Sequence, residues 1–231
     1  MRIWDVSPAY LNRQSLLGEH RELHGLVSIL VNKKKGYARH PETLRWAGYG
    51  WAIRIRHLML SKEMHLRGYI DNTPVLMRSN KGEWPTEYID TPSKQLDILK
   101  EKYLENESGR LSLPKNAQQM WSQHKYSILA RDQNLYKKIG REVAVVKRNE
   151  DFSELADLLS KSLRIPPSTG GIRNALQHMW GYISANSPPD SLANNISSLS
   201  NLLAATQHYS IETGEPYLMN STALGELGVW L

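Results

Sequence analysis

Residues 11–32 read LNRQSLLGEHRELHGLVSILVN. Apolar side chains recur along this stretch at three- and four-residue steps, at Leu16, Leu23, Leu26, Val27 and Leu30. This spacing is typical of a helix that buries one face. No stretch of useful length elsewhere in the sequence alternates as a half-buried strand would, so the sequence predicts an all-α fold.

The opposite face of this predicted helix is polar and contains two glycines. Its members, at helical spacing, are Gln14, Gly18, Arg21, Glu22 and Gly25. Glycine inside a helix costs about 1 kcal/mol relative to alanine, and close approach by a ligand or another backbone is a common reason to tolerate it. We therefore expect a partner to dock against this face.

Two histidines of the same helix, His20 and His24, suggest a metal site because Glu22 lies between them. Each helical residue advances by about 100°, so the histidines share a face while Glu22 projects to nearly the opposite side. Zinc hydrolases instead place the glutamate directly after the first histidine. We therefore expect no metal here, and two histidines that are solvated or hydrogen-bonded.

The next segments also predict helices. KKKGY at residues 33–37 closes the first helix, with Gly36 as its expected cap. Residues 40–69 predict one long second helix, with Pro41 in its first turn and Gly68 beyond its end. Residues 71–95 are rich in Pro, Asn, Thr and Gly and predict an extended connection.

The remaining sequence indicates a second helical domain. Helical patterns cover residues 96–104, 117–148, 151–163, 171–185 and 190–208. They are interrupted by NESGRLSLPKN at residues 106–116, which we interpret as a domain boundary. A length of 231 residues suits two domains. The sequence thus predicts a small helical domain at 1–110 and a second helical domain at 111–231.

Composition excludes several classes of protein. The sequence contains no cysteine, which rules out disulfides, iron–sulfur clusters, thiolate zinc sites and cysteine nucleophiles. It has no run of about 18 apolar residues and no apolar signal-peptide region at its start. We therefore expect a cytoplasmic protein that has no membrane partner.

The positive charge is concentrated in the first part of the chain. Residues 1–95 contain 15 of the 29 Lys and Arg residues and 9 of the 23 Asp and Glu residues. The remaining residues contain 14 of each kind, so residues 1–95 hold all of the net charge of +6. This asymmetry favours a nucleic acid as the partner, although a solvated basic surface explains the charge equally well. The candidate contacts in these basic segments are Lys33, Lys34, Lys35 and Arg45.

Four short motifs, in order and at compatible spacing, resemble the pyrimidine-dimer DNA glycosylase family. They are MRIW at residues 1–4, LLGEHREL at 16–23, KKGYARHPETLRW at 34–46 and LRGY at 66–69. The likeness is concentrated in residues 1–70 and extends toward residue 100. It implies a small all-α enzyme that acts on double-stranded DNA without a cofactor. Such an enzyme cuts the glycosidic bond at a pyrimidine dimer and then breaks the strand by β-elimination.

The resemblance also implies roles for particular residues. In that family the nucleophile is the amino group of the first residue, and the essential carboxylate is the Glu of an Arg-Glu-Leu triplet. Those roles fall here on Met1 and Glu22. Arg2 and Arg21 match arginines that the family uses on DNA, and Gln14 shares their helical face. Because α-amines are more often neutral than lysine amines at neutral pH, they are usable nucleophiles.

The sequence departs from the family in two places. The phage member of the family exposes a processed threonine, whereas here Met1 is followed by Arg2. Methionine aminopeptidase acts poorly before large residues, so we expect Met1 to be retained and its own amine to react. The aromatic-rich carboxyl-terminal segment that helps the phage enzyme to hold its lesion has no clear counterpart. The reaction type is therefore better supported than the substrate lesion.

Other candidates in the first domain are interpreted as structural. Glu19 lies in the same motif as Glu22 but falls near the apolar stripe, so we expect it to form a structural ion pair. Trp46 and Trp51 are able to stack on bases, but at helical spacing they are more often core residues.

The second domain resembles a YbgA-type domain, a helical domain often found with nucleic-acid repair or modification proteins. The resemblance rests on MWSQHKYSILARDQNLYKKIGREVA at 120–144 and RNALQHMWGYIS at 173–184. The matching candidates include His124, Lys125, Arg173 and His178. The two histidines could meet in a cleft, or they could simply pack two helices together. We assign this domain no catalytic role.

Three functions remain open from the sequence. The first is a DNA glycosylase with abasic-site lyase activity. The second is a non-catalytic nucleic-acid-binding module built on the same scaffold. The third is RNA processing by the same amine chemistry, which is disfavoured because a 2′-hydroxyl changes the elimination step.

Overall fold

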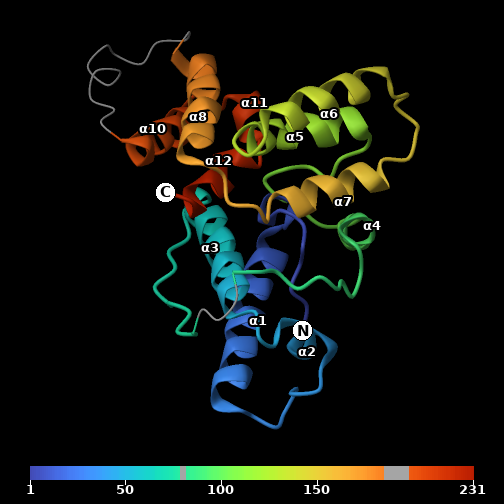
Figure 1. Cartoon of the computed structure of the whole chain (residues 1–231), viewed down its shortest axis with the longest axis vertical. Helices are drawn as coiled ribbons and strands as arrows, with labels where there is room; N and C mark the ends of the chain where they lie inside the picture. Colours follow the sequence, from blue (N-terminus) through green and yellow to red (C-terminus); the bar gives the residue numbers. More distant parts are fainter. Residues whose placement is uncertain (79–81, 185–197) are drawn as a thin grey trace. The chain divides into compact units, whose positions relative to one another are not determined.

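The computed structural model describes residues 1–78, 82–184 and 198–231 (Figure 1). These residues are helical, with no strand among them, so the predicted all-α fold is confirmed. They form two compact units, residues 1–109 and 110–231. No described helix has the length and apolar character needed to cross a membrane.

The first helix of unit 1 follows the sequence prediction closely. After the short turn η1 (Pro8–Tyr10), α1 covers Arg13–Asn32. The side chain of Asn12 caps its start by accepting a hydrogen bond from the Ser15 N–H at 2.8 Å. Its end differs from the prediction: Lys33, at φ 50°, is the left-handed cap instead of Gly36.

The predicted long helix over residues 40–69 is wrong, because the chain breaks inside it. Helix α2 covers Pro41–Trp46 and α3 covers Gly50–Leu66. Between them Ala47 is extended and Gly48 has a φ of +88°, a conformation that glycine adopts without steric cost.

Helix α4 closes unit 1. It covers Pro92–Lys102 and so begins four residues before the predicted start. Thr91 caps it, and Pro92 occupies the first turn, where the missing N–H is not needed. The described residues between α3 and α4 contain no regular element, as the prediction of an extended connection requires.

The core of unit 1 joins α1, α3 and the amino-terminal segment. Helix α1 packs against α3 (Figure 1). The predicted apolar stripe of α1 is buried at Leu16, Leu23, Leu26 and Val27, while Leu30 is half-buried. Ile3, Trp4, Val6 and Ala9 through Leu11 are also buried. The segment from Ile3 to Leu11 is therefore part of the core.

Unit 2 is built from helices throughout its described residues. Its elements are α5 (Ala117–Leu129), α6 (Gln133–Val145), α7 (Ser153–Ser162), α8 (Thr169–Ser184), α10 (Leu199–Glu212), α11 (Pro216–Met219), α12 (Ala223–Glu226) and η2 (Leu227–Val229). Helices α5 and α6 pack together, as do α8 and α10.

The predicted helix over residues 117–148 of unit 2 is interrupted. Asp132 starts a new helix by accepting the N–H groups of Asn134 and Leu135. Residues 190–197 of the helix predicted over 190–208 lie outside the described residues. The short helices α11 and α12 were not predicted.

Candidate active site

The amino-terminal segment is held by four consecutive backbone N–H groups, each of which donates to a side chain from a helix. Arg2 N–H donates to Glu22 of α1, and Ile3 N–H donates to Glu42 of α2 at 3.1 Å. Trp4 N–H donates to Glu19 of α1 at 3.1 Å, and Asp5 N–H donates to Gln95 of α4 at 2.7 Å. Since three different helices provide these acceptors, their packing fixes where the first residue lies.

This arrangement brings the α-amino group close to Glu22. The Met1 nitrogen lies 3.9 Å from Glu22 Oε1, while the other carboxylate oxygen accepts the Arg2 N–H. The Met1 side chain is 10% exposed and the Glu22 side chain is 42% exposed. A primary amine therefore lies beside a carboxylate that solvent, or a ligand, can reach.

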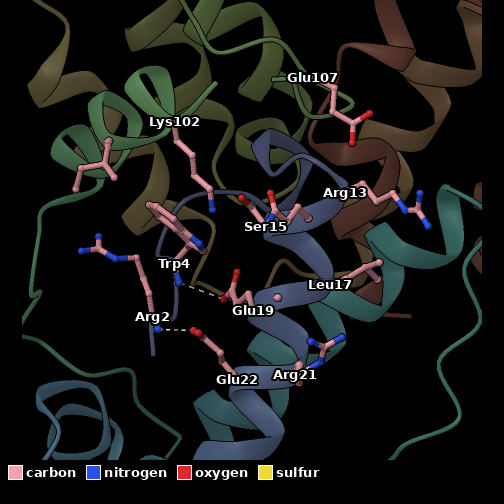
Figure 2. Close-up of a pocket in the computed structure, with 13 residues that line it drawn as sticks. Arg2, Trp4, Arg13, Ser15, Leu17, Glu19, Arg21, Glu22, Lys102 and Glu107 are labelled. Atoms are coloured by element: carbon pink, nitrogen blue, oxygen red, sulfur yellow. Dashed lines mark hydrogen bonds between the residues drawn. The ribbon is translucent and has the colours of Figure 1, made fainter. Parts of the chain in front are cut away.

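Glu22 faces a pocket of about 780 Å³ within unit 1 (Figure 2). The walls come from the amino-terminal segment, α1, α4 and the residues after α4. The lining residues are Arg2, Trp4, Arg13, Gln14, Ser15, Leu17, Gly18, Glu19, Arg21, Glu22, Ile98, Lys102 and Glu107. Three predicted members of the polar face, Gln14, Gly18 and Arg21, thus line the same pocket as Glu22.

The pocket contains cationic side chains that have no carboxylate partner. Within the described part of the chain, no ion pair engages the side chains of Arg13, Arg21 or Lys102, and all three residues are exposed. Arg2 is different, because its guanidinium pairs with Asp90 at 2.8 Å and lies 5.0 Å from the Trp4 ring. The three free cations make this pocket a suitable surface for phosphate groups.

Glu19 also lines the pocket, but it is committed to a buried ion pair. Its two oxygens accept hydrogen bonds from Arg56 Nε at 2.7 Å and from Arg56 Nη2 at 2.8 Å. Burial raises the pKa of Glu19 to about 6, against the lowering effect of Arg56. The predicted structural ion pair is confirmed. Glu19 fixes α1 against α3 and also holds Trp4.

The two glycines on the polar face of α1 allow a test of whether DNA comes close to this helix. A Cβ built on Gly18 or Gly25 meets nothing within 4 Å, and only Gly18 lines the pocket. We therefore expect Gly18→Ala and Gly25→Ala each to raise the free energy of unfolding by about 1 kcal/mol. If DNA approaches the helix at Gly18, Gly18→Leu should weaken DNA binding, as measured by fluorescence anisotropy, because its side chain fills the pocket.

Gly25→Leu is the matched control, since it makes the same change on an exposed part of the same helix outside the pocket. Equal affinity of Gly18→Leu and Gly25→Leu for duplex DNA would show that nothing docks close to Gly18.

The guanidinium of Arg45, a predicted DNA contact, already has partners within the protein. Its side chain is 4% exposed, and it pairs with Asp5 and, at 3.3 Å, with Glu42. Its Nε donates to the Glu87 carbonyl at 2.7 Å. A guanidinium with these partners is not free to bind a phosphate, so we leave Arg45 out of the proposed DNA surface.

The other predicted contacts and aromatic residues lie away from this pocket. Lys33, Lys34 and Lys35 are exposed at the end of α1 and do not line the pocket, and Lys34 Nζ donates to the Ser28 hydroxyl at 2.8 Å. Trp46 is 1% exposed, which confirms it as a core residue. Trp51 is half-buried, with its ring 6.1 Å from that of Trp84.

His20 and His24 lie away from Glu22, as the helical spacing predicted. They are not isolated, because the fold brings His57 of α3 and Asp71 to the same place. These four residues are the group in the described chain that could hold a metal ion.

The candidates in unit 2 have different environments. His124 is fully buried, with Nδ1 3.0 Å from the Met120 carbonyl oxygen, and burial lowers its pKa to about 4. His178 and Arg173 are exposed, so a cleft shared by the two histidines receives no support. Lys125 contacts the Tyr217 hydroxyl, and its Nζ lies 4.2 Å from the Tyr217 ring.

Sequence reasoning missed several pocket residues, among them Trp4, Arg13 and Lys102. The sequence could have indicated Arg13, because Arg13, Leu17 and Arg21 follow one another at four-residue steps on α1. Trp4 lies in the first quoted motif but shows no periodicity. Lys102 enters the pocket from α4, and no sequence spacing connects it to α1.

Comparisons with known proteins match the two units separately. Residues 1–77 match a family model described as pyrimidine dimer DNA glycosylase. Residues 125–226 match a model described as a protein of unknown function, DUF1722. No curated protein and no solved structure matched the chain. The first match supports a DNA-repair glycosylase at the level of the family. The second gives no further name, so the YbgA-type likeness stays a prediction.

Proposed function

We propose that the chain is a DNA glycosylase with abasic-site lyase activity, which acts on damaged bases in duplex DNA, pyrimidine dimers foremost. The nucleophile is the α-amine of Met1, and Glu22 is the catalytic carboxylate. The observation that carries this proposal is the 3.9 Å separation of the Met1 nitrogen from Glu22, beside a pocket with free cations. The match of residues 1–77 to the glycosylase family supports it.

The reaction uses the chain's own groups in two stages. The neutral amine attacks C1′ of the damaged nucleotide, and the glycosidic bond breaks as the base departs with the bonding electrons and takes up a proton. The product is an aminal, in which the C1′–O4′ bond of the sugar ring then breaks and O4′ takes up a proton. The protonated imine that results acidifies the C2′ hydrogen. Glu22 accepts that proton, the C3′–O bond breaks and the 3′-phosphate leaves. Water then hydrolyses the imine and restores the amine.

Glu22 suits this role because of how it is held. The Arg2 N–H fixes one of its oxygens and leaves the other near the amine. A carboxylate in that place also stabilises the positive charge that develops on the imine nitrogen. Its partial exposure leaves room for the sugar of a bound nucleotide.

The proposed DNA surface consists of the cationic and polar side chains around this pocket. Arg2, Gln14 and Arg21 remain from the sequence prediction, and the pocket adds Arg13 and Lys102. Phosphates are the expected partners of Arg13, Arg21 and Lys102, whereas Arg2 would have to exchange Asp90 for a phosphate. Phosphate contacts position the strand without reading its sequence. Lys33, Lys34 and Lys35 are secondary candidates, since a longer duplex could reach the end of α1.

Borohydride trapping on an abasic duplex tests the proposal. Borohydride reduces the imine to a stable secondary amine, so the protein should become covalently fixed to the strand. Peptide mapping should then locate the adduct on the α-amine of Met1. Mass spectrometry of the intact protein must first establish that this amine is free.

The matched variants add one residue before Met1 or one residue after Leu231. Only the first moves the amine away from Glu22, so only the first should abolish trapping. An adduct on an internal lysine such as Lys102, or no adduct from folded protein that still binds DNA, would favour the alternative. In that alternative, unit 1 is a non-catalytic nucleic-acid-binding module.

A further inference from the structure

Four ligand-type side chains from three segments of unit 1 converge on one point. His20 and His24 come from α1, His57 comes from α3, and Asp71 follows α3. Their ligand atoms all lie within 4.8 Å of one another. Only the first two are close in sequence, so packing of α1 against α3 is what assembles the group.

The distances within this cluster are those of ligands around a small cation. His57 Nε2 lies 3.1 Å from His24 Nε2 and 3.3 Å from Asp71 Oδ2, and His20 Nε2 lies 3.3 Å from Asp71 Oδ1. In a tetrahedral zinc site with bonds of about 2.0–2.1 Å, neighbouring ligand atoms are roughly 3.3–3.4 Å apart.

Hydrogen bonds within the chain account for only part of the cluster. The Nε2 atom of His20 is buried and, although it lies 3.3 Å from Asp71 Oδ1, it forms no hydrogen bond with a described residue. Unpaired buried nitrogens are rare in folded proteins, and each one needs an explanation. His24 Nε2 shares a hydrogen bond with His57 Nε2 at 3.1 Å and another with the Thr73 hydroxyl at 3.2 Å, and the three imidazole ring centroids lie 4.7–5.1 Å apart. A bound cation would satisfy all of these atoms together.

We propose that His20, His24, His57 and Asp71 bind a divalent transition-metal ion, with zinc the best fit to three imidazoles and one carboxylate. All four positions are occupied by protein, which is typical of a structural site. The ion fastens the segment after α3 onto α1 and α3. It lies on the face of α1 away from Glu22, so the proposal does not rest on the proposed function.

The surroundings support this assignment. Thr73 donates to Asp71 Oδ1 with its hydroxyl at 2.7 Å and its N–H at 3.0 Å, and such outer contacts typically orient a metal-binding carboxylate. His57 and Asp71 also line a cavity of about 440 Å³, which gives an ion a path to the site.

Metal content of the untagged full chain tests the proposal. The protein is stripped with a chelator, incubated with Zn²⁺, freed of excess ion and analysed by mass spectrometry of the metal. We expect stoichiometric zinc in the wild type and in His65→Ala, which removes an exposed histidine from the same helix as His57. Asp71→Asn, which keeps the size of the side chain, and His57→Ala should each lose most of the zinc.

Thermal unfolding distinguishes a variant that has lost the metal site from one that has failed to fold. Adding Zn²⁺ to the stripped wild type should raise Tm by roughly 5 °C or more, because the ion binds only the folded form. The same addition should leave the Tm of Asp71→Asn unchanged. Cobalt in place of zinc should give the visible absorption of a tetrahedral site. A wild type that neither retains zinc nor gains Tm, or zinc retained equally by Asp71→Asn, overturns the proposal.

Discussion

Glu22→Gln is expected to lower the rate of strand cleavage at an abasic site by about 10²–10⁴-fold, with little change in DNA affinity. The amide keeps the size of the carboxylate, and its oxygen still accepts the Arg2 N–H. It cannot take up the C2′ proton or offset the charge of the imine. Single-turnover cleavage of a duplex with one abasic site gives the rate, and anisotropy with the same duplex gives the affinity.

Glu107→Gln is the matched control for this experiment. Glu107 lines the same pocket, at the far end from Glu22 in Figure 2, and the substitution makes the same chemical change. It should leave the cleavage rate near that of the wild type. Equal rates for Glu22→Gln and the wild type would remove Glu22 from the mechanism. Equal losses in both variants would point to pocket charge instead of proton transfer.

Arg56→Met is expected to destabilise unit 1 by about 3–5 kcal/mol, because it leaves the Glu19 carboxylate buried without a counter-ion. The side chains of Arg56 and Glu19 are 3% and 0% exposed. The substitution also removes the hydrogen bond from Arg56 Nη1 to the Val6 carbonyl at 2.9 Å. Calorimetry of the full chain should show a large fall in Tm for the transition that contains unit 1.

Two comparisons isolate the buried charge as the cause. Arg54→Met makes the same change at an exposed position of α3 and should leave Tm nearly unchanged. The double variant Glu19→Leu with Arg56→Met should lose less stability than Arg56→Met alone, since it leaves no uncompensated charge. A double variant at least as unstable as the single one would show that packing, and not charge, explains the loss.

The sequence by itself determined the local features of this protein. The apolar stripe of α1, its polar face and the placement of Glu22 away from His20 and His24 follow from helical geometry, which depends only on near neighbours. The same reasoning separated Glu19 from Glu22. The motifs of residues 1–70 also indicated the glycosylase family, which the match over residues 1–77 supports.

Sequence reasoning failed where backbone conformation changed without a change in hydrophobic pattern. The break between α2 and α3 depends on Gly48 at a positive φ, and the interruption before α6 depends on the cap at Asp132. Both residues were visible in the sequence. Glycine and aspartate also occur inside helices, however, so their presence alone does not place a helix end.

Only the tertiary structure decided which distant residues meet. It paired Glu19 with Arg56, 37 positions away, and Arg45 with Asp5. It also brought Lys102 into the pocket and added His57 and Asp71 to the two histidines of α1.

The position of the amino terminus has the same origin. Residues 2–5 carry no periodic signal, and they are fixed because their N–H groups donate to side chains of α1, α2 and α4. Helical periodicity reports which side of one helix is buried, whereas contacts between segments depend on how the helices pack. The proposed chemistry, which needs an amine beside Glu22, therefore rests on packing that no local pattern encodes.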